Sequence, residues 1–227
     1  MQVGVLLLAA GRGNRMGGGV PKQYLSAGGK PLLLLALESL AREPRISVVQ
    51  PVIAEDDRHY AAMVENARFP YRLLPAVSGG KERADSMRHG LAALPEDVDW
   101  VAVHDAARPI PSAALLAAVL DTAAAHGAAV PGLAVHDTIK QVDDQGRVMR
   151  TLARSALRAV QTPQVARRAW FEQALGSAQG AAEWTDDASL LEAAGFPVYV
   201  SAGEENNRKI TTAEDLAWLR RLMEARD

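Results

Sequence analysis

Short, continuous apolar runs alternate with longer segments of helical periodicity along most of this chain. Residues 3–8 form one such run, which is typical of a strand buried on both faces. Residues 113–125 instead repeat their apolar side chains at the spacing of one helix face. Strands that alternate with helices predict an α/β layered fold with a largely parallel central sheet. The strand candidates are residues 3–8, 48–53, 72–74, 101–103, 128–135 and 198–201, and the helix candidates are residues 32–42, 56–67, 84–93, 113–125, 167–178, 186–194 and 213–224.

Residues 135–160 interrupt this alternation. The segment is polar, and the run Asp-Asp-Gln-Gly at residues 143–146 is a turn signal in its middle. The pattern predicts a β-hairpin arm that protrudes between core elements, although a plain surface excursion would look the same. We therefore expect a single domain over residues 1–227, with residues 135–160 as its arm.

Composition narrows the classes of function and location. A formal net charge of −2 argues against a general nucleic-acid binder, which would normally present a basic face. The absence of cysteine excludes disulfides, thiolate catalysis and thiolate metal sites. The first apolar run is short and lacks a basic leader, and no apolar run is long enough to cross a bilayer. These features predict a soluble cytoplasmic protein, and from a length of 227 residues we expect no second catalytic domain.

Small residues and two cations follow the first predicted strand. Glycine and alanine leave room for a ligand against the backbone, so their N–H groups can point at phosphate oxygens. The two basic side chains add fixed positive charge beside those N–H groups. This combination predicts a site for a nucleoside triphosphate. The small residues are Ala9, Ala10, Gly11 and Gly13, and the basic residues are Arg15 and Lys22.

Two common phosphate-binding motifs do not fit this loop. A P-loop ends in Gly-Lys-Ser/Thr, whereas Gly29 and Lys30 are followed by Pro31. A dinucleotide-binding turn needs a third glycine at the position where this chain has Met16. The loop therefore indicates another class of nucleotide site.

The string from Leu6 to Tyr24 resembles the start of nucleotidyltransferases of the sugar-nucleotide pyrophosphorylase type. Within that type, motifs along nearly the whole chain resemble the 2-C-methyl-D-erythritol 4-phosphate cytidylyltransferase family of the non-mevalonate isoprenoid pathway. The resemblance implies a Rossmann-like layered nucleotidyltransferase fold with a mostly parallel central sheet and a protruding β-arm. The matching segments are residues 6–16, 21–24, 79–83, 104–109, 137–140, 161–164, 185–189 and 207–211.

The reaction that the resemblance implies joins CTP to 2-C-methyl-D-erythritol 4-phosphate, with release of pyrophosphate. The attacking phosphate monoester carries about −1.5 to −2 charges near neutral pH, so it needs little activation. The obstacle is to bring two anions together and to stabilise the crowded phosphorus. Cations, Mg²⁺ and positioning answer that need, and no general base is required. We therefore expect His104 to be structural, and we interpret Glu82 and Arg83 as an ion pair.

The resemblance also assigns roles to individual residues. Asp105 follows a predicted strand, where its carboxylate would face the crevice and bind Mg²⁺, although a helix-capping role is the alternative. The family pattern places Lys209 against the reacting phosphates. Relatives often carry an aspartate where this chain has Asn206, and the adjacent Glu205 is a candidate replacement for it. The implied set is Arg15, Lys22 and Lys209 for catalysis; Ala9, Ala10, Gly11, Gly13, Gly80, Ser86 and Asp105 for CTP; and Asp105 for the metal.

The arm carries residues that the resemblance assigns to the second substrate. Thr138 and Arg154 match positions that bind methylerythritol phosphate from the neighbouring subunit, together with Lys209. Arginine suits this task because its planar fork can bond a phosphate in a bidentate manner. The implied assembly is a homodimer in which each arm completes the other active site. If the arm is only structural, these two residues are a hairpin threonine and a solvated arginine.

Other functions remain open from the residues alone. A ribitol-5-phosphate cytidylyltransferase shares the glycine loop, although Lys140 after Asp-Thr-Ile favours the isoprenoid enzyme. A nucleotidyltransferase for another sugar phosphate would commonly be longer. A non-catalytic nucleotide-binding regulatory module would be expected to have lost Arg15, Lys22 or Asp105, and all three are present.

Overall fold

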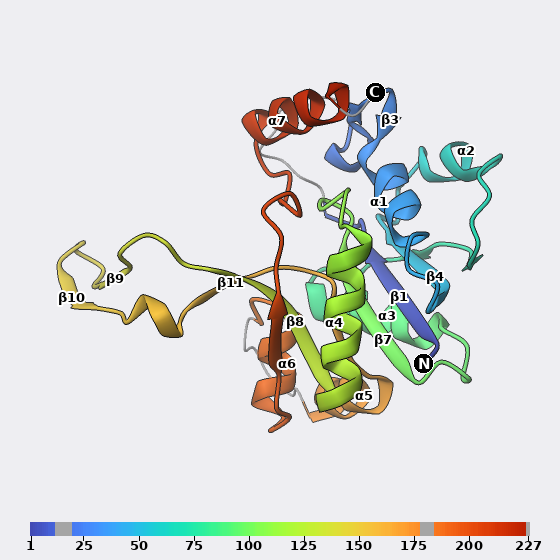
Figure 1. Ribbon diagram of the computed structural model, residues 1–227. Helices are drawn as coiled ribbons and strands as arrows, with labels where there is room; N and C mark the ends of the chain where they lie inside the picture. The colour runs from blue at the N-terminus through green and yellow to red at the C-terminus, as the bar shows by residue number, and fades with distance from the viewer. Residues whose placement is uncertain (12–19, 178–183, 226–227) are drawn as a thin grey trace.

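A central sheet between two layers of helices forms the body of the protein (Figure 1). The computed structural model describes residues 1–11, 20–177 and 184–225. The strands are β1 (Val3–Leu8), β2 (Ser26–Ala27), β3 (Lys30–Pro31), β4 (Ile46–Ile53), β5 (Arg72–Leu73), β6 (Val77–Ser78), β7 (Trp100–Asp105), β8 (Ala128–Ala134), β9 (Lys140–Val142), β10 (Val148–Thr151), β11 (Arg158–Val160), β12 (Gln164–Arg167) and β13 (Tyr199–Ala202). The α-helices are α1 (Leu32–Leu40), α2 (Tyr60–Val64), α3 (Arg83–Ala93), α4 (Ala113–His126), α5 (Arg168–Ser177), α6 (Asp187–Ala193) and α7 (Ala213–Glu224), and the one-turn 3₁₀ helices are η2 (Lys22–Tyr24) and η3 (Arg154–Ala156).

Parallel pairing organises the sheet around β1. This strand lies between β4 and β7 and runs parallel to both. The strand order is β11-β8-β12-β7-β1-β4-β5, with β13 beside β8 and β6 beside β4. The carboxyl ends of β1, β4, β6 and β7 therefore lie at one edge, where sheets of this kind bind their ligands. The predicted α/β class with a mostly parallel central sheet is confirmed.

β12 is an antiparallel strand that the sequence pattern did not predict. It pairs with β7 on one side and with β8 on the other. Gln164 and Arg167 leave only two apolar residues between them, which is too short a run to indicate a buried strand. As a result, the helix predicted to begin at residue 167 begins at Arg168.

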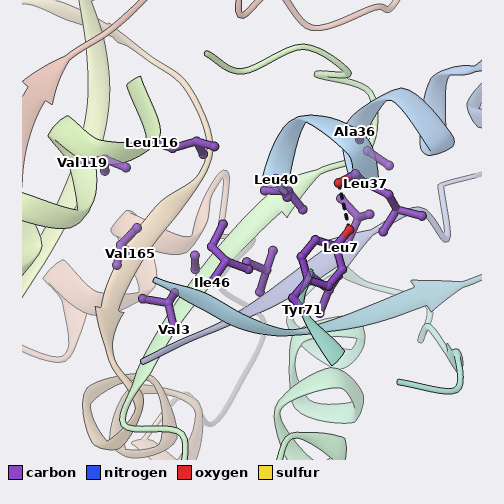
Figure 2. Close-up of a cluster of buried hydrophobic side chains, with 14 of the residues drawn as sticks. Val3, Leu7, Ala36, Leu37, Leu40, Ile46, Tyr71, Leu116, Val119 and Val165 are labelled. Atoms are coloured by element: carbon purple, nitrogen blue, oxygen red, sulfur yellow. Dashed lines mark hydrogen bonds between the residues drawn. The ribbon is translucent and has the colours of Figure 1, made fainter. Parts of the chain in front are cut away.

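Alternating side chains of β1 divide the apolar core into two halves. Val3 and Leu7 belong to a cluster with α1 and α4, whereas Leu6 belongs to a cluster with α3, α5 and α6. Figure 2 shows the first cluster, with Leu37 of α1 and Val119 of α4 among its members. This alternation is the period of a strand covered by helices on both faces. None of the helices in the described ranges is long and apolar enough to span a membrane.

Side chains that accept backbone N–H groups set where two of the helices begin. Thr212 accepts the N–H of Asp215 at 3.2 Å, and α7 starts at the next residue, as the sequence predicts. By contrast, α2 is much shorter than the predicted helix over residues 56–67. The Asp57 carboxylate accepts the backbone N–H groups of His59 and Tyr60, each at 2.9 Å, so the helix cannot begin until Tyr60.

The arm extends to one side of the body, beyond the end of β8 (Figure 1). Within it, β9 and β10 pair with each other in a separate antiparallel sheet. Gly146 lies in the turn between them with φ of 81°, a value that favours glycine. Val142, Val148 and Met149 lie in this hairpin with 52%, 54% and 57% of their surface exposed, which is an unusual concentration of exposed apolar side chains.

Candidate active site

A cleft of about 620 Å³ lies at the carboxyl ends of the parallel strands. Its walls come from the loops that follow β1, β4, β6 and β7, and from the segment that precedes α7. Most of the residues predicted for nucleotide binding and catalysis line this cleft: Ala9, Ala10, Gly11, Lys22, Gly80, Ser86, Asp105 and Lys209. Thus the sheet brings together segments that are widely separated in the sequence.

Two glycines in the wall of the cleft are packed too closely against their neighbours to carry a side chain. A Cβ on Gly79 would lie 2.4 Å from the Cβ of Ala10 and 2.8 Å from the Ser86 hydroxyl oxygen, so no larger residue fits without displacing them. A Cβ on Gly80 would lie 2.1 Å from the Cβ of Asp85. The N–H of Gly80 donates to the Ser86 hydroxyl at 3.1 Å and fixes that side chain at the wall. The loop therefore presents backbone and one hydroxyl to a ligand. Gly79 was not among the predicted site residues.

Asp105 is the last residue of β7, and cations hold both of its carboxylate oxygens. Arg83 donates through Nη1 to Oδ1 at 2.7 Å, and the Lys209 ammonium lies 2.7 Å from Oδ2. Burial by itself would raise the pKa of Asp105, but the charges of Arg83 and Lys209 outweigh that effect and hold it well below its usual range. The side chain is therefore an anion at the floor of the cleft.

Arg83 was interpreted from the sequence as the ion-pair partner of Glu82, and that interpretation is wrong. The guanidinium forms a bidentate pair with Asp187, through Nε at 2.9 Å and Nη2 at 2.6 Å, in addition to its bond to Asp105. Glu82 instead caps α3 in a reciprocal pair with Asp85. Arg83 therefore ties together the beginnings of α3 and α6 and the end of β7.

His104 is fully buried behind this carboxylate and has two specific partners. The Arg108 carbonyl, 3.0 Å from Nε2, can only accept, so Nε2 carries the ring proton. Nδ1 then accepts from the Thr162 hydroxyl at 3.0 Å, and that hydroxyl oxygen accepts the N–H of Asp105 at 3.1 Å. Burial lowers the pKa of His104 to about 4, so the ring is neutral at neutral pH. This geometry fits a structural role.

Lys22 reaches the cleft from a single 3₁₀ turn. Its ammonium lies 3.3 Å from the carbonyl oxygen of Ile210, the residue that follows Lys209. Ile210 is itself fixed, because its N–H donates to the Ala107 carbonyl at 2.7 Å. The two lysines thus border the same segment of backbone, and their ammonium groups can bind a polyphosphate, whereas the charge of Arg83 is balanced by Asp105 and Asp187.

Several predicted residues do not lie in this cleft. Gly13 and Arg15 are outside the residues that the structure describes. Thr138 and Arg154 are exposed on the arm and do not line the cleft of their own chain. Arg154 donates through Nη1 to the carbonyl of His136 at 2.7 Å, which bridges the two legs of the arm.

A second cavity of about 420 Å³ adjoins the cleft, and Lys209 lines both. Arg108 and Arg208 add further positive charge to its wall. Glu205, the candidate second carboxylate, also lines this cavity and does not line the main cleft. The second cavity therefore suits another anion, placed beside whatever occupies the first.

Comparison with known proteins gives consistent matches over the whole chain. A sequence model of the IspD family, described as 2-C-methyl-D-erythritol 4-phosphate cytidylyltransferase, matches residues 3–225. The bifunctional enzyme IspD/IspF of Nitrobacter winogradskyi is 43% identical over 216 residues, which cover 92% of this chain and 53% of that enzyme. The 2-C-methyl-D-erythritol 4-phosphate cytidylyltransferase of Pelotomaculum thermopropionicum is 41% identical over 227 residues, covering 99% of this chain and 95% of that protein. The chain thus spans about half the length of the bifunctional relatives that it matches.

Solved structures agree with these sequence matches. The crystal structure of 2-C-methyl-D-erythritol 4-phosphate cytidylyltransferase from Thermus thermophilus superposes with a TM-score of 0.77 at 33% identity, over 99% of this chain and 100% of that one. The 4-diphosphocytidyl-2C-methyl-D-erythritol synthase of Anaerococcus prevotii gives a TM-score of 0.83 at 27% identity, over 98% of both chains. The fold expected from the sequence, a layered nucleotidyltransferase fold, is confirmed.

Proposed function

We propose that this protein transfers a cytidylyl group from CTP to 2-C-methyl-D-erythritol 4-phosphate, because the chain belongs to the 2-C-methyl-D-erythritol 4-phosphate cytidylyltransferase family. The observation that carries the proposal is that two cationic cavities meet at Lys209. A reaction between two phosphorylated substrates needs such a junction, because the phosphate of one must approach a phosphorus of the other. The product would be 4-diphosphocytidyl-2-C-methyl-D-erythritol, an isoprenoid precursor.

The proposed step exchanges one phosphorus–oxygen bond for another. An oxygen of the methylerythritol phosphate bonds to the α-phosphorus of CTP. At the same time, the bond breaks between that phosphorus and the oxygen that bridges it to the β-phosphorus. Pyrophosphate leaves with that oxygen. The attacking monoester is already ionised near neutral pH, so no residue has to remove a proton. Lys22, Lys209 and Arg15 would lower the barrier by placing positive charge around the reacting phosphates.

The cleft wall formed by Ala10, Gly79, Gly80 and Ser86 is our candidate for the pyrimidine site. Backbone N–H and carbonyl groups can read the edge of a base when side chains do not intervene, and the close glycine contacts leave little room for any. The Ser86 hydroxyl accepts from Gly80 and can still donate its own hydrogen to a base carbonyl. Ala9, Gly11 and Gly13 would complete the nucleotide site through their backbone.

Asp105 fits a magnesium ion carried by the triphosphate. Its carboxylate lies in the cleft and already binds two cationic groups, which indicates that this position favours positive charge. No cluster of three or more metal-ligating side chains occurs in the described ranges, so Asp105 and substrate phosphate oxygens would supply the ligands. When bound, the metal would neutralise phosphate charge. Lys209, with 43% of its side chain exposed, is the partner free to move from Asp105 to the phosphates, whereas Asp187 keeps Arg83 in place.

Thr138 and Arg154 would act on the acceptor of a neighbouring subunit in a homodimer. Two features of the arm support this proposal: it lies away from its own cleft, and its hairpin exposes apolar side chains that a second copy could cover. The bond from Arg154 to the His136 carbonyl uses one Nη1 hydrogen and leaves other guanidinium N–H groups for a phosphate.

Release of pyrophosphate with CTP and Mg²⁺ tests the proposal, with methylerythritol 4-phosphate or ribitol 5-phosphate as the acceptor. Turnover with the first acceptor alone is the expected result. Turnover with ribitol phosphate would instead make the protein a ribitol-5-phosphate cytidylyltransferase. No turnover with either acceptor would contradict the proposal. Lys22→Ala should abolish most of the activity, whereas Lys30→Ala, which removes an exposed lysine paired with Glu38, should have no effect.

A further inference from the structure

The turn that carries Lys22 is too short to hold its own shape. It is a single 3₁₀ turn of three residues, and no side chain caps its beginning. One turn of helix fixes several backbone angles in return for one or two hydrogen bonds, so an isolated turn is unstable. The position of the backbone that carries Lys22 therefore depends on how the next two residues, Gln23 and Tyr24, are attached to the rest of the protein, while the ammonium itself contacts the Ile210 carbonyl.

Gln23 and Tyr24 fasten the turn at two separate points. Gln23 is buried, and its Nε2 donates at 2.9 Å to the carbonyl of Ala9, the residue that follows β1. The Tyr24 hydroxyl donates to Oδ2 of Asp57 at 2.6 Å. Hydrogen bonds to a carboxylate are stronger than those between neutral groups. We therefore expect loss of the bond to Asp57 to disturb the turn more than loss of the bond to the Ala9 carbonyl.

Asp57 is in turn held by the loop that follows β4. Its second oxygen accepts two backbone N–H groups, and its own N–H donates to the Ala54 carbonyl at 3.1 Å. The same loop contributes Ala54 and Glu55 to the wall of the cleft. The bond between Tyr24 and Asp57 thus connects the turn bearing Lys22 to the cleft wall formed by the β4 loop.

We propose that Tyr24 is a positioning residue, whose hydrogen bond to Asp57 holds Lys22 in the cleft. Tyr24 and Asp57 do not line the cleft themselves, so their influence on a substrate passes through the turn. The proposal rests on the proposed function, because its effect on rate is expressed through Lys22. Small displacements of a catalytic group lower rates steeply, and we expect loss of this bond to reduce turnover about 10-fold.

Tyr24→Phe removes only the hydroxyl, and Tyr71→Phe is its matched control. The Tyr71 hydroxyl donates to the Leu37 carbonyl at 2.8 Å (Figure 2), and both rings pack against the same apolar cluster. Tyr71 does not line the cleft. Thermal unfolding should shift to a similar extent in both variants, while only Tyr24→Phe should lose turnover. Equal losses of turnover in the two variants would overturn the proposal.

A double-mutant cycle with Lys22→Ala separates positioning from a general structural effect. Tyr24→Phe should reduce turnover about 10-fold when Lys22 is present and less than about 2-fold when it is replaced by alanine, because a positioning residue has nothing left to position. The same loss in both backgrounds would overturn the proposal. Asp57→Asn, which weakens the bond by removing the charge, should show the same dependence on Lys22 with a smaller loss.

Calorimetric titration with CTP makes the test independent of catalysis. The same cycle is measured as CTP affinity, and Tyr24→Phe should weaken binding only when Lys22 is present. If the wild-type protein releases no pyrophosphate, the proposed function fails while this cycle still tests the attachment. If Lys22→Ala lowers both turnover and CTP affinity but Tyr24→Phe lowers neither, the attachment fails and the proposed function stands.

Discussion

His104 should make the folded protein sensitive to mildly acidic conditions. The neutral ring is bonded on both nitrogens, and burial lowers its pKa from the ordinary 6.5 to about 4. A protonated ring would turn a second donor toward the Thr162 hydroxyl, which already donates to it. Because the folded pKa lies below the unfolded one, His104 stabilises the fold fully above the unfolded pKa, and this contribution is lost as the pH falls toward the folded pKa.

The size of the effect follows from the two pKa values. Their difference corresponds to about 3 kcal/mol in total, of which about 2 kcal/mol should be lost between about pH 7 and pH 5. Asp105 does not contribute in that window, because Arg83 and Lys209 hold its pKa well below its usual range against the opposing effect of burial. Burial raises the pKa of Asp187, so protonation of that carboxyl would oppose the loss, and only a comparison with a variant that lacks the histidine isolates the contribution of His104.

Urea unfolding across this pH range measures the loss directly. His104→Asn replaces the ring with a polar group that does not titrate, and His136→Gln is the control because His136 is exposed on the arm. The dependence of unfolding free energy on pH should become shallower in His104→Asn and stay unchanged in His136→Gln. Parallel pH dependence in the wild type and His104→Asn would refute the reasoning, whatever their absolute stabilities.

Three further substitutions test other parts of the structure. Arg154→Ala should raise the KM for methylerythritol phosphate about 10-fold or more in steady-state kinetics; a loss confined to CTP affinity would contradict the arm assignment. Arg83→Met should lower the unfolding free energy in urea by about 3 kcal/mol, because it removes the guanidinium that pairs with two buried carboxylates; an unchanged midpoint would contradict this. Gly80→Ala should lower thermal stability by about 1–3 kcal/mol through its clash with Asp85, and wild-type stability would show that the loop can relax.

Much of the sheet could be predicted because its parallel strands are buried on both faces. β1, β4, β7 and β8 appear in the sequence as apolar runs, and the structure has strands at all four positions. β12 could not be predicted in this way, because its antiparallel pairing between β7 and β8 depends on partners distant in sequence. The start of α2 was missed for a local reason, since one aspartate turns the chain before the helix can form.

The candidate site could be predicted where its chemistry is local. The small residues after β1 and the carboxylate at the end of β7 stand at strand ends, and the sheet topology brings strand ends together. The bond between Arg83 and Asp187 could not be predicted, because 104 residues separate the two. One signal was available: a cation in the first turn of α3 opposes the helix dipole, so Arg83 needed a compensating partner. The choice of acceptor and the role of the arm came from the family resemblance, since no residue pattern within one chain specifies them.

The connection between the arm and the sheet decides how the arm can move. β11 pairs with β8 from Arg158 opposite Ala134 to Val160 opposite Gly132, so the two legs of the arm are hydrogen-bonded to each other where they leave the sheet. An arm paired at its base is a cantilever: it is fixed at one end, and its tip keeps a defined position and orientation. A flexible linker would act as a tether, which limits only how far the tip can reach. For a tether, the effective concentration of the tip at a neighbouring site changes gradually with linker length. For a cantilever, removing one pair of residues would rotate and retract the tip together, and the binding that we propose across a dimer would be lost in one step.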